Sequence, residues 1–213
     1  MNKEKFFMAF DTETGSRDPK EADLLTFYAA IIDEDFKLVE ELYLKLKPDD
    51  GKCPIAHAEA LKVNKIDITS HLKDPETITY SEGKKRLYLM LKKYAKKVGK
   101  TNNIRPMGYN VPFDIKWTQH YLISEKEWET LFHYKYVDVM QSVDFLRDSG
   151  WFPKDIGSLT SVVDYLQIPH RSAHNSREDT LMTVDVYKKI LEIMSSKKDG
   201  GQAQDLISLL EAE

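Results

Sequence analysis

The chain has 213 residues, a hydrophobic fraction of 41% and a formal net charge of −4. These values favour a folded domain with a real core, and they argue against a disordered chain or a protein that binds nucleic acid through its total charge. No segment reaches the ~20 continuous apolar residues of a membrane helix, and the single cysteine, Cys53, cannot form an internal disulfide. We therefore expect a soluble cytoplasmic protein (in the host compartment if the sequence is viral) with no membrane partner.

The first third of the chain has the pattern of β-strands. Residues 6–10 form a continuous apolar run, which is typical of a buried central strand. Residues 24–32 predict a second strand, and a short acidic connection leads to a third over residues 37–47. In that third strand leucines alternate with charged residues, so we expect one covered face and one wet face. This order predicts a three-strand meander.

Helices and strands alternate in the rest of the chain. Short strands are predicted at 104–109 and 134–139, and helices at 55–63, 80–98, 112–122, 125–132, 140–147, 158–166 and 176–194. The pattern predicts an α/β protein with a mixed five-stranded sheet, a meander plus two parallel strands, flanked by helices. We expect residues 1–195 to form one domain and residues 196–213 to form a polar linker with a short amphipathic tail.

Two carboxylates follow directly after the first predicted strand. Asp11 and Glu13 are two residues apart, so on a strand they share one face and lie about 6.6 Å apart along the chain. Two like charges beside a core strand are unfavourable unless a cation compensates them, and carboxylate oxygens suit Mg²⁺ or Mn²⁺. The alternative is a strand that simply becomes polar where it reaches solvent.

Two later segments carry further polar candidates. Asp114 follows a predicted strand, a turn and Pro112, so it lies at the start of a helix, where a capping carboxylate is the ordinary interpretation. His174 and Asp179 are five residues apart, which places them ~140° apart around a helix axis. The two side chains can then flank one site without pointing at the same atom.

Taken together, the three segments resemble the DEDDh branch of the DnaQ-like 3′→5′ exonucleases, within the ribonuclease H-like superfamily. Asp11 and Glu13 match the first motif, Asp114 the second, and His174 with Asp179 the third, in the order of the family. A sister branch carries tyrosine at the position held here by Asn175, so the histidine branch is indicated.

The chain departs from the family pattern at two places. Ser16 follows Gly15 where many relatives have a hydrophobic residue, and Asn64-Lys65 replaces a common His-Gly. Both places concern the grip on substrate rather than the chemistry. The wedge against the terminal base is therefore expected from another residue, such as Leu24.

The resemblance implies a two-metal hydrolysis of single-stranded DNA from its 3′ end, with release of nucleoside 5′-monophosphates, as in proofreading, replication or repair. It implies that His174 is the general base and that two Mg²⁺ or Mn²⁺ ions are held by four carboxylates. The catalytic set is then His174, Asp11, Glu13, Asp114 and Asp179. Substrate contacts are expected from residues beside the carboxylates: Thr12, Thr14, Gly15, Asn110 and Phe113.

Other interpretations remain open from the sequence. The same branch includes exoribonucleases, and a catalytically inactive nucleic-acid-binding module or a metal-free carboxylate hydrolase belongs to a different class. Basic residues within 84–100 face away from the apolar side of their helix, which is typical of a solvated surface. The apolar residues 206–210 either dock on a partner, such as a replication protein, or pack on their own domain.

Overall fold

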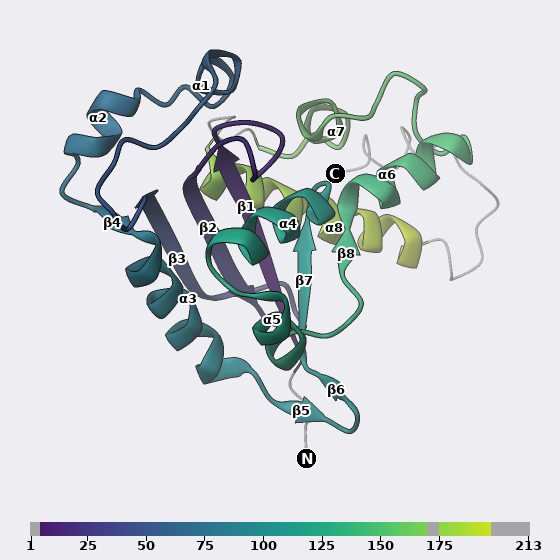
Figure 1. Cartoon of the computed structure of the whole chain (residues 1–213). Helices are drawn as coiled ribbons and strands as arrows, with labels where there is room; N and C mark the ends of the chain where they lie inside the picture. The colour runs from purple at the N-terminus through teal and green to yellow at the C-terminus, as the bar shows by residue number, and fades with distance from the viewer. Residues whose placement is uncertain (1–4, 170–174, 197–213) are drawn as a thin grey trace.

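The computed structural model describes residues 5–169 and 175–196. Its centre is a six-stranded mixed sheet in the order β4-β3-β2-β1-β7-β8 (Figure 1). The strands are β1 (Phe6–Thr14), β2 (Leu24–Ile32), β3 (Leu38–Lys47), β4 (Thr77–Thr79), β7 (Ile104–Gly108) and β8 (Val137–Asp138). The first three strands form the expected antiparallel meander, whereas β7 and β8 add parallel to β1 and β4 adds parallel to β3.

The predicted number of five strands is wrong, because β4 was not expected. This strand has only three residues, and it pairs with Lys45 to Lys47 of β3. So short a segment has no periodic pattern of its own, and its pairing depends on the free edge that β3 offers. The other five strands are found where the sequence predicted them, with small shifts at their ends.

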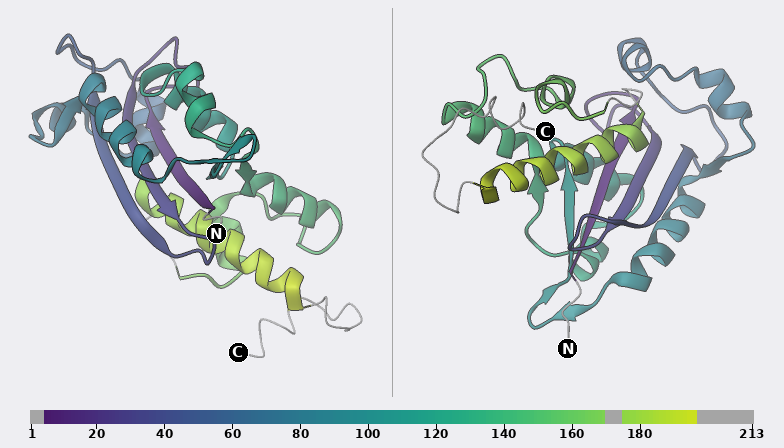
Figure 2. Two further views of the ribbon diagram at one scale, coloured as in Figure 1. Left: turned by 90° about the horizontal axis from the view of Figure 1, so that it is seen from below. Right: turned by 180° about the vertical axis from the view of Figure 1, so that it is seen from behind.

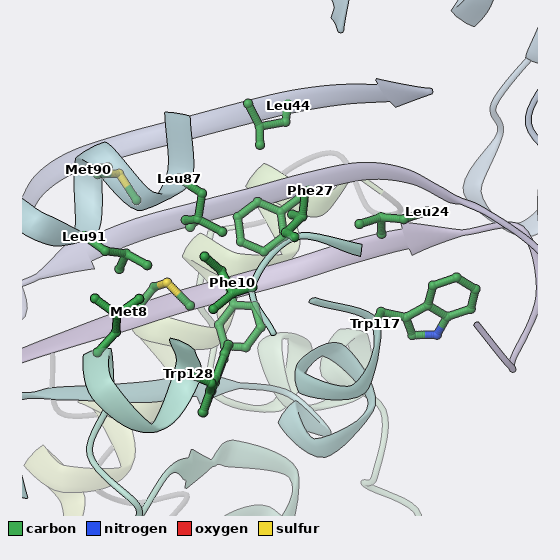
Figure 3. Close-up of a cluster of buried hydrophobic side chains, with 14 of the residues drawn as sticks. Met8, Phe10, Leu24, Phe27, Leu44, Leu87, Met90, Leu91, Trp117 and Trp128 are labelled. Carbon is green, nitrogen blue, oxygen red and sulfur yellow. The ribbon is translucent and has the colours of Figure 1, made fainter. Parts of the chain in front are cut away.

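Two helical layers cover the sheet. On one face lie α3 (Tyr80–Tyr94), α4 (Val111–Tyr121) and α5 (Glu125–Leu131), and on the other lie α6 (Val139–Asp148), α7 (Leu159–Tyr165) and α8 (Ser176–Ser196) (Figures 1 and 2). All nine residues of β2 are buried, including Leu24 at its start. Figure 3 shows part of the first core layer, where Phe10 and Phe27 of the sheet meet Leu87 of α3 and Trp128 of α5.

The third strand is covered on one face only in its second half. Leu44 and Leu46 are buried, but Leu38 is 45% exposed. The alternating leucines therefore mark a covered face only where α3 packs on the strand.

Residues 95–102 differ from the expected structure. The sequence predicted a helix through Val98, but α3 ends at Tyr94, and β5 (Lys97–Val98) pairs with β6 (Thr101–Asn102) as a small hairpin. Gly99 in its turn has φ of 67°, a left-handed conformation that glycine adopts without steric penalty. Two short helices, α1 (Ala58–Asn64) and α2 (Ile68–Lys73), follow β3; the first corresponds to the helix predicted at 55–63, and the second lies where no helix was predicted.

The parallel strands determine where polar side chains gather. Because β1, β7 and β8 run in the same direction, their carboxyl ends meet at one edge of the sheet. The chain leaves β7 at this edge and enters α4, and it leaves β8 and enters α6. None of the helices within residues 5–169 and 175–196 combines the length and the apolar character that a membrane crossing requires.

Candidate active site

Three carboxylates converge beyond the buried part of β1. Asp11 and Glu13 lie on the side of β1 that packs against α8, and Asp179 lies in the first turn of α8. One carboxylate oxygen from each residue lies within 4.8 Å of those of the other two. The fold thus brings together side chains that are 168 positions apart in the sequence, in an arrangement that can hold a cation.

The electrostatics of this cluster are those of crowded, partly desolvated carboxylates. Burial, together with the charges of Asp114, Glu13 and Asp179, raises the pKa of Asp11 well above its usual value. Burial and the charges of Asp179 and Asp114 raise the pKa of Glu13 to about 8. A divalent cation relieves both the desolvation and the repulsion, and hard oxygen donors are those that Mg²⁺ and Mn²⁺ prefer. The donor set therefore fits such an ion.

Asp114 has a different environment from the three clustered carboxylates. It lies in the first turn of α4 and approaches β1 from the opposite face, where its Oδ1 accepts hydrogen bonds from the backbone N–H of Thr12 (3.0 Å) and from the Thr12 hydroxyl (2.6 Å). Burial raises the pKa of Asp114 to about 7, although the two bonds from Thr12 oppose that rise. Asp114 is close enough to Asp11 to affect its pKa, but it is not a member of the three-residue cluster.

His174, the predicted general base, lies outside the described residues. Asn175 is the next described residue, and its Oδ1 accepts a hydrogen bond from the backbone N–H of Arg177 at the start of α8. Asn175 thus supplies a side-chain acceptor at this helix start. The predicted amphipathic tail also lies outside the described residues.

Asp138 is a structural carboxylate that the sequence analysis did not single out. Its Oδ1 accepts hydrogen bonds from the backbone N–H of Asn110 (3.0 Å) and of Met140 (3.1 Å). It thereby joins the end of β8 to the turn that precedes α4, in which Asn110 has a left-handed φ of 63°. Through this turn Asp138 helps to fix Asp114. Its position near the end of the strand predicted at 134–139 was the available signal.

A groove of about 610 Å³ opens beside the carboxylate cluster. Of the predicted substrate-binding residues, Thr12, Thr14 and Phe113 line this groove, whereas Gly15 and Asn110 do not. The remaining lining comes from the β1–β2 loop, from Glu13 and from the segment around α1: Ser16, Arg17, Glu21, His57, Glu59, Ala60, Val63 and Asn64. The sequence predicted a helix at 55–63, but only tertiary packing places α1 next to β1 as a wall of the groove.

Backbone packing explains why the residue after Thr14 is glycine. A Cβ on Gly15 would lie 2.4 Å from the carbonyl oxygen of Ile55 and 2.9 Å from the Cα of Ala56. The Gly15 carbonyl accepts a hydrogen bond from the backbone N–H of His57, and the Asn64 side chain donates to the carbonyl of Thr14. Gly15 therefore holds the α1 segment against the end of β1, and its contact with substrate remains a prediction.

The expectation that Leu24 supplies a wedge is wrong. Leu24 is fully buried among the core side chains in Figure 3, so it cannot reach a bound strand. Val63 is an apolar side chain that lines the groove and is 61% exposed. It directly precedes Asn64-Lys65, the second place at which the sequence departs from its family pattern.

The basic residues of α3 behave as a solvated helix face, as expected. Lys84 pairs with Glu127, Arg86 with Glu82, and Lys93 with Glu40. These ion pairs neutralise part of the positive charge of α3.

No protein-family model matches the chain, and no curated protein matches it either. Solved structures do match. The zinc-bound form of the E. coli exonuclease I–single-stranded DNA complex has a TM-score of 0.70 at 20% identity, over 88% of this chain and 40% of that one. E. coli exonuclease I in complex with a dT13 oligonucleotide gives 0.68 at 20% identity, over 88% and 41%.

A moderately thermophilic exonuclease I from Methylocaldum szegediense gives a TM-score of 0.67 at 21% identity, over 89% of this chain and 40% of that one. The chain therefore spans about two fifths of the length of these structures. At such low identity the likeness concerns the fold and not the activity. The chain has the mixed-sheet, ribonuclease H-like fold that these exonucleases share.

Proposed function

We propose that the chain is a divalent-metal-dependent exonuclease that removes nucleotides from the 3′ end of single-stranded DNA. The observation that carries the proposal is the convergence of Asp11, Glu13 and Asp179, with ligand oxygens within 4.8 Å of one another, at the edge of a fold shared with exonuclease I. The solved relatives include complexes with single-stranded oligonucleotides, which supports this class of substrate.

In this proposal Asp11, Glu13 and Asp179 would hold one divalent ion, and Asp114 together with Asp11 would hold a second. When bound, Mg²⁺ or Mn²⁺ stabilises negative charge on the scissile phosphate and lowers the pKa of water. The three clustered carboxylates would fix the position of the ion. Two of them lie on the central strand β1 and the third in the first turn of α8. His174 takes the proton of the attacking water, a task that an imidazole with a pKa near neutrality can perform.

The groove beside the cluster is assigned to the terminal nucleotides of the strand. Thr12, Thr14 and Ser16 supply hydroxyl groups to its lining, and Phe113 and Val63 supply apolar surface against which a base can stack or wedge. Arg17, which also lines the groove, supplies a positive charge for a phosphate. The groove thus combines the polar and apolar contacts that a single strand requires.

Digestion of labelled oligonucleotides tests this function. Matched DNA substrates with a blocked 3′ or a blocked 5′ end are incubated with Mg²⁺, with Mn²⁺ or with EDTA. We expect hydrolysis only with a metal and only from a free 3′ end, with nucleoside 5′-monophosphates as products. Unchanged activity of Asp11→Ala in a clean preparation, or activity that survives EDTA, contradicts the proposal.

A parallel assay with RNA oligonucleotides distinguishes a DNA exonuclease from an exoribonuclease. A ribose 2′-hydroxyl is sensed by close contacts around the terminal nucleotide, so oligonucleotides of the same sequence in DNA and RNA form compare the two directly. Faster hydrolysis of the RNA strand would assign the same chemistry to an exoribonuclease. Binding without hydrolysis of either strand would indicate an inactive nucleic-acid-binding module.

A further inference from the structure

The first turn of α8 carries Asp179, so its position decides whether the three carboxylates meet. The first four N–H groups of a helix have no partner within the helix, and the helix start is therefore held mainly by what it packs against. In Figure 2 α8 crosses the back of the sheet. Its first turn meets side chains from β2 and β3.

The strand register places these side chains next to the carboxylates of β1. Tyr28 of β2 is the cross-strand partner of Asp11, and Thr26 is the partner of Glu13. Directly opposed residues of antiparallel strands share a face, with Cβ atoms about 4.5–5.5 Å apart. The same β2 residues that flank the carboxylates of β1 are thus available to hold α8.

Both β2 residues take part in contacts with the start of α8. The hydroxyl oxygens of Thr26 and Ser176 lie 3.3 Å apart in a buried position. The Tyr28 hydroxyl donates to Oε2 of Glu41 on β3 (2.6 Å). Glu41 in turn accepts two hydrogen bonds from Arg177, from Nε to Oε2 at 3.0 Å and from Nη2 to Oε1 at 3.3 Å.

The chemistry of this arrangement favours a fixed geometry. A guanidinium presents its N–H groups as a planar fork, so a two-pronged pair with a carboxylate fixes direction as well as distance. The hydrogen bonds from Arg177 and Tyr28 hold the pKa of Glu41 below its usual value, so this carboxylate is ionised at neutral pH. The guanidinium carbon of Arg177 also lies 5.9 Å from the centre of the Tyr28 ring.

The exposure of the Arg177–Glu41 ion pair indicates that it contributes to the position of α8 more than to the stability of the fold. The side chains of Arg177 and Glu41 are 39% and 41% exposed, and ion pairs with such exposure contribute little to the stability of a fold. A displacement of Asp179 by a fraction of an ångström, in contrast, directly changes a three-carboxylate metal site. Arg177 lies two residues before Asp179 in the same helical turn.

We propose that Tyr28, Glu41 and Arg177 form a positioning clamp that fixes the start of α8 to the sheet, so that Asp179 meets Asp11 and Glu13 with the spacing that a divalent cation requires. The inference rests on the proposed function of those three carboxylates as metal ligands. It assigns the three clamp residues no contact with substrate. Tyr28 lies opposite Asp11 on the neighbouring strand and bonds to Glu41, so it links the β1 side of the metal site to the α8 side.

A calorimetric titration of the intact chain with Mn²⁺ alone measures the Kd for the metal and tests the clamp without an activity assay. Loss of a partner that orients a ligand typically weakens metal affinity 10- to 100-fold, so we expect Arg177→Gln and Glu41→Gln each to raise the Kd for Mn²⁺ by about tenfold or more. The double variant should be no weaker than either single variant, because both remove the same contact. Arg177→Lys keeps the charge but loses the fork, and should recover only part of the affinity.

A matched control is Arg86→Gln, which breaks the Arg86–Glu82 pair on α3 at a similar N–O distance. It should leave the Kd for Mn²⁺ unchanged. In oligonucleotide hydrolysis at saturating metal, the clamp variants should lower kcat and leave KM nearly unchanged, because the groove is intact. Tyr28→Phe, which retains the ring, provides a second variant if Arg177→Gln folds poorly, and it too should raise the Kd.

The outcomes separate this inference from the function on which it rests. If the wild-type chain binds Mn²⁺ in a manner that Asp11→Asn abolishes, while Arg177→Gln and Tyr28→Phe bind it as the wild type does, the clamp is overturned and the proposed function stands. If the wild-type chain and Asp11→Asn bind Mn²⁺ equally, the metal site is refuted and the clamp with it.

Discussion

On the face of β1 that α8 covers, Asp11, Glu13 and Asp179 crowd their carboxylates together, while on the opposite face Asp114 receives two hydrogen bonds from Thr12. Repulsion between neighbouring carboxylates adds to burial in raising the pKa of Asp11 and of Glu13. At Asp114 the donors from Thr12 oppose the rise that burial causes. The difference teaches that the clustered carboxylates depend on a cation for compensation, whereas Asp114 is already compensated in part by the protein.

The strongest test of this contrast is Asp11→Asn. The change removes a charge from the centre of the cluster, so activity should fall by about 10³-fold or more, given that metal ions contribute several kcal/mol to the transition state. The same change should raise the melting temperature of the protein in EDTA at pH 8, because a neutral amide avoids both the desolvation of a carboxylate and its repulsion by Glu13 and Asp179. Nuclease assays and thermal denaturation of the same preparation measure both effects. Asp155→Asn, at an exposed position, is the control and should change neither.

The second prediction concerns pH. Glu13 and Asp114 have folded-state pKa values of about 8 and about 7, above their unfolded values, so their contribution to stability is fully present below pH ~4 and is lost as pH rises through about 7 to 8. The pKa of Asp11 is raised as well, so this group contributes in the same direction. A difference of one pH unit between the folded-state and unfolded-state pKa of a group corresponds to roughly 1.4 kcal/mol in the free energy of unfolding. In EDTA the free energy of unfolding should therefore decrease between pH 5 and pH 9, and Mg²⁺ should restore it most at high pH.

Denaturant unfolding at several pH values, with EDTA and with Mg²⁺, measures this dependence. Glu13→Gln should flatten the profile in EDTA, because it removes the group whose pKa is raised to about 8. A profile in EDTA that does not change with pH, or that Glu13→Gln leaves unaltered, contradicts the description of the cluster.

A third prediction addresses the groove wall beyond the carboxylates. In Gly15→Ala the new methyl group meets the backbone of Ile55 and Ala56, which cannot move as a flexible side chain would. We expect a loss of ~1–3 kcal/mol in the free energy of unfolding, typical of overpacking, together with a higher KM for the oligonucleotide as α1 is displaced. Gly157→Ala, where the nearest atom is the end of the Arg147 side chain at 3.3 Å, is the control. Equal KM values for the Gly15 variant and the wild type would refute the role of the wall.

The smallest expected effect is at Thr12. Thr12→Val keeps the shape of the side chain but removes the hydroxyl that donates to Asp114 at 2.6 Å, which should cost ~1 kcal/mol of stability. The pKa of Asp114 should rise further, because that hydrogen bond opposes its present rise. Thermal denaturation and an NMR titration of Asp114 check the two parts. Thr14→Val removes a hydroxyl that donates instead to the carbonyl of Ser16, and it should leave the pKa of Asp114 unchanged.

Much of the fold was predictable because its signals are local. The continuous apolar runs of β1 and β2 and the helical spacing in α3 come from side chains that are neighbours in the sequence. In contrast, β4 and the β5–β6 hairpin are only two or three residues long, so their structure depends on distant partners and on the turn at Gly99. The burial of Leu24 could not be predicted either, since a buried leucine and an exposed wedge have the same local sequence pattern.

The sequence by itself determined which chemistry was available to this protein: two carboxylates of β1 share a face because a strand has a period of two. Only the tertiary structure decided that Asp179 joins them while Asp114 approaches from the opposite face and bonds to Thr12. The same holds for α1 as a groove wall and for Arg177 reaching Glu41 across the sheet. The physical reason is that these contacts join positions far apart in the chain, and packing of helices on a sheet, not local periodicity, sets their distances.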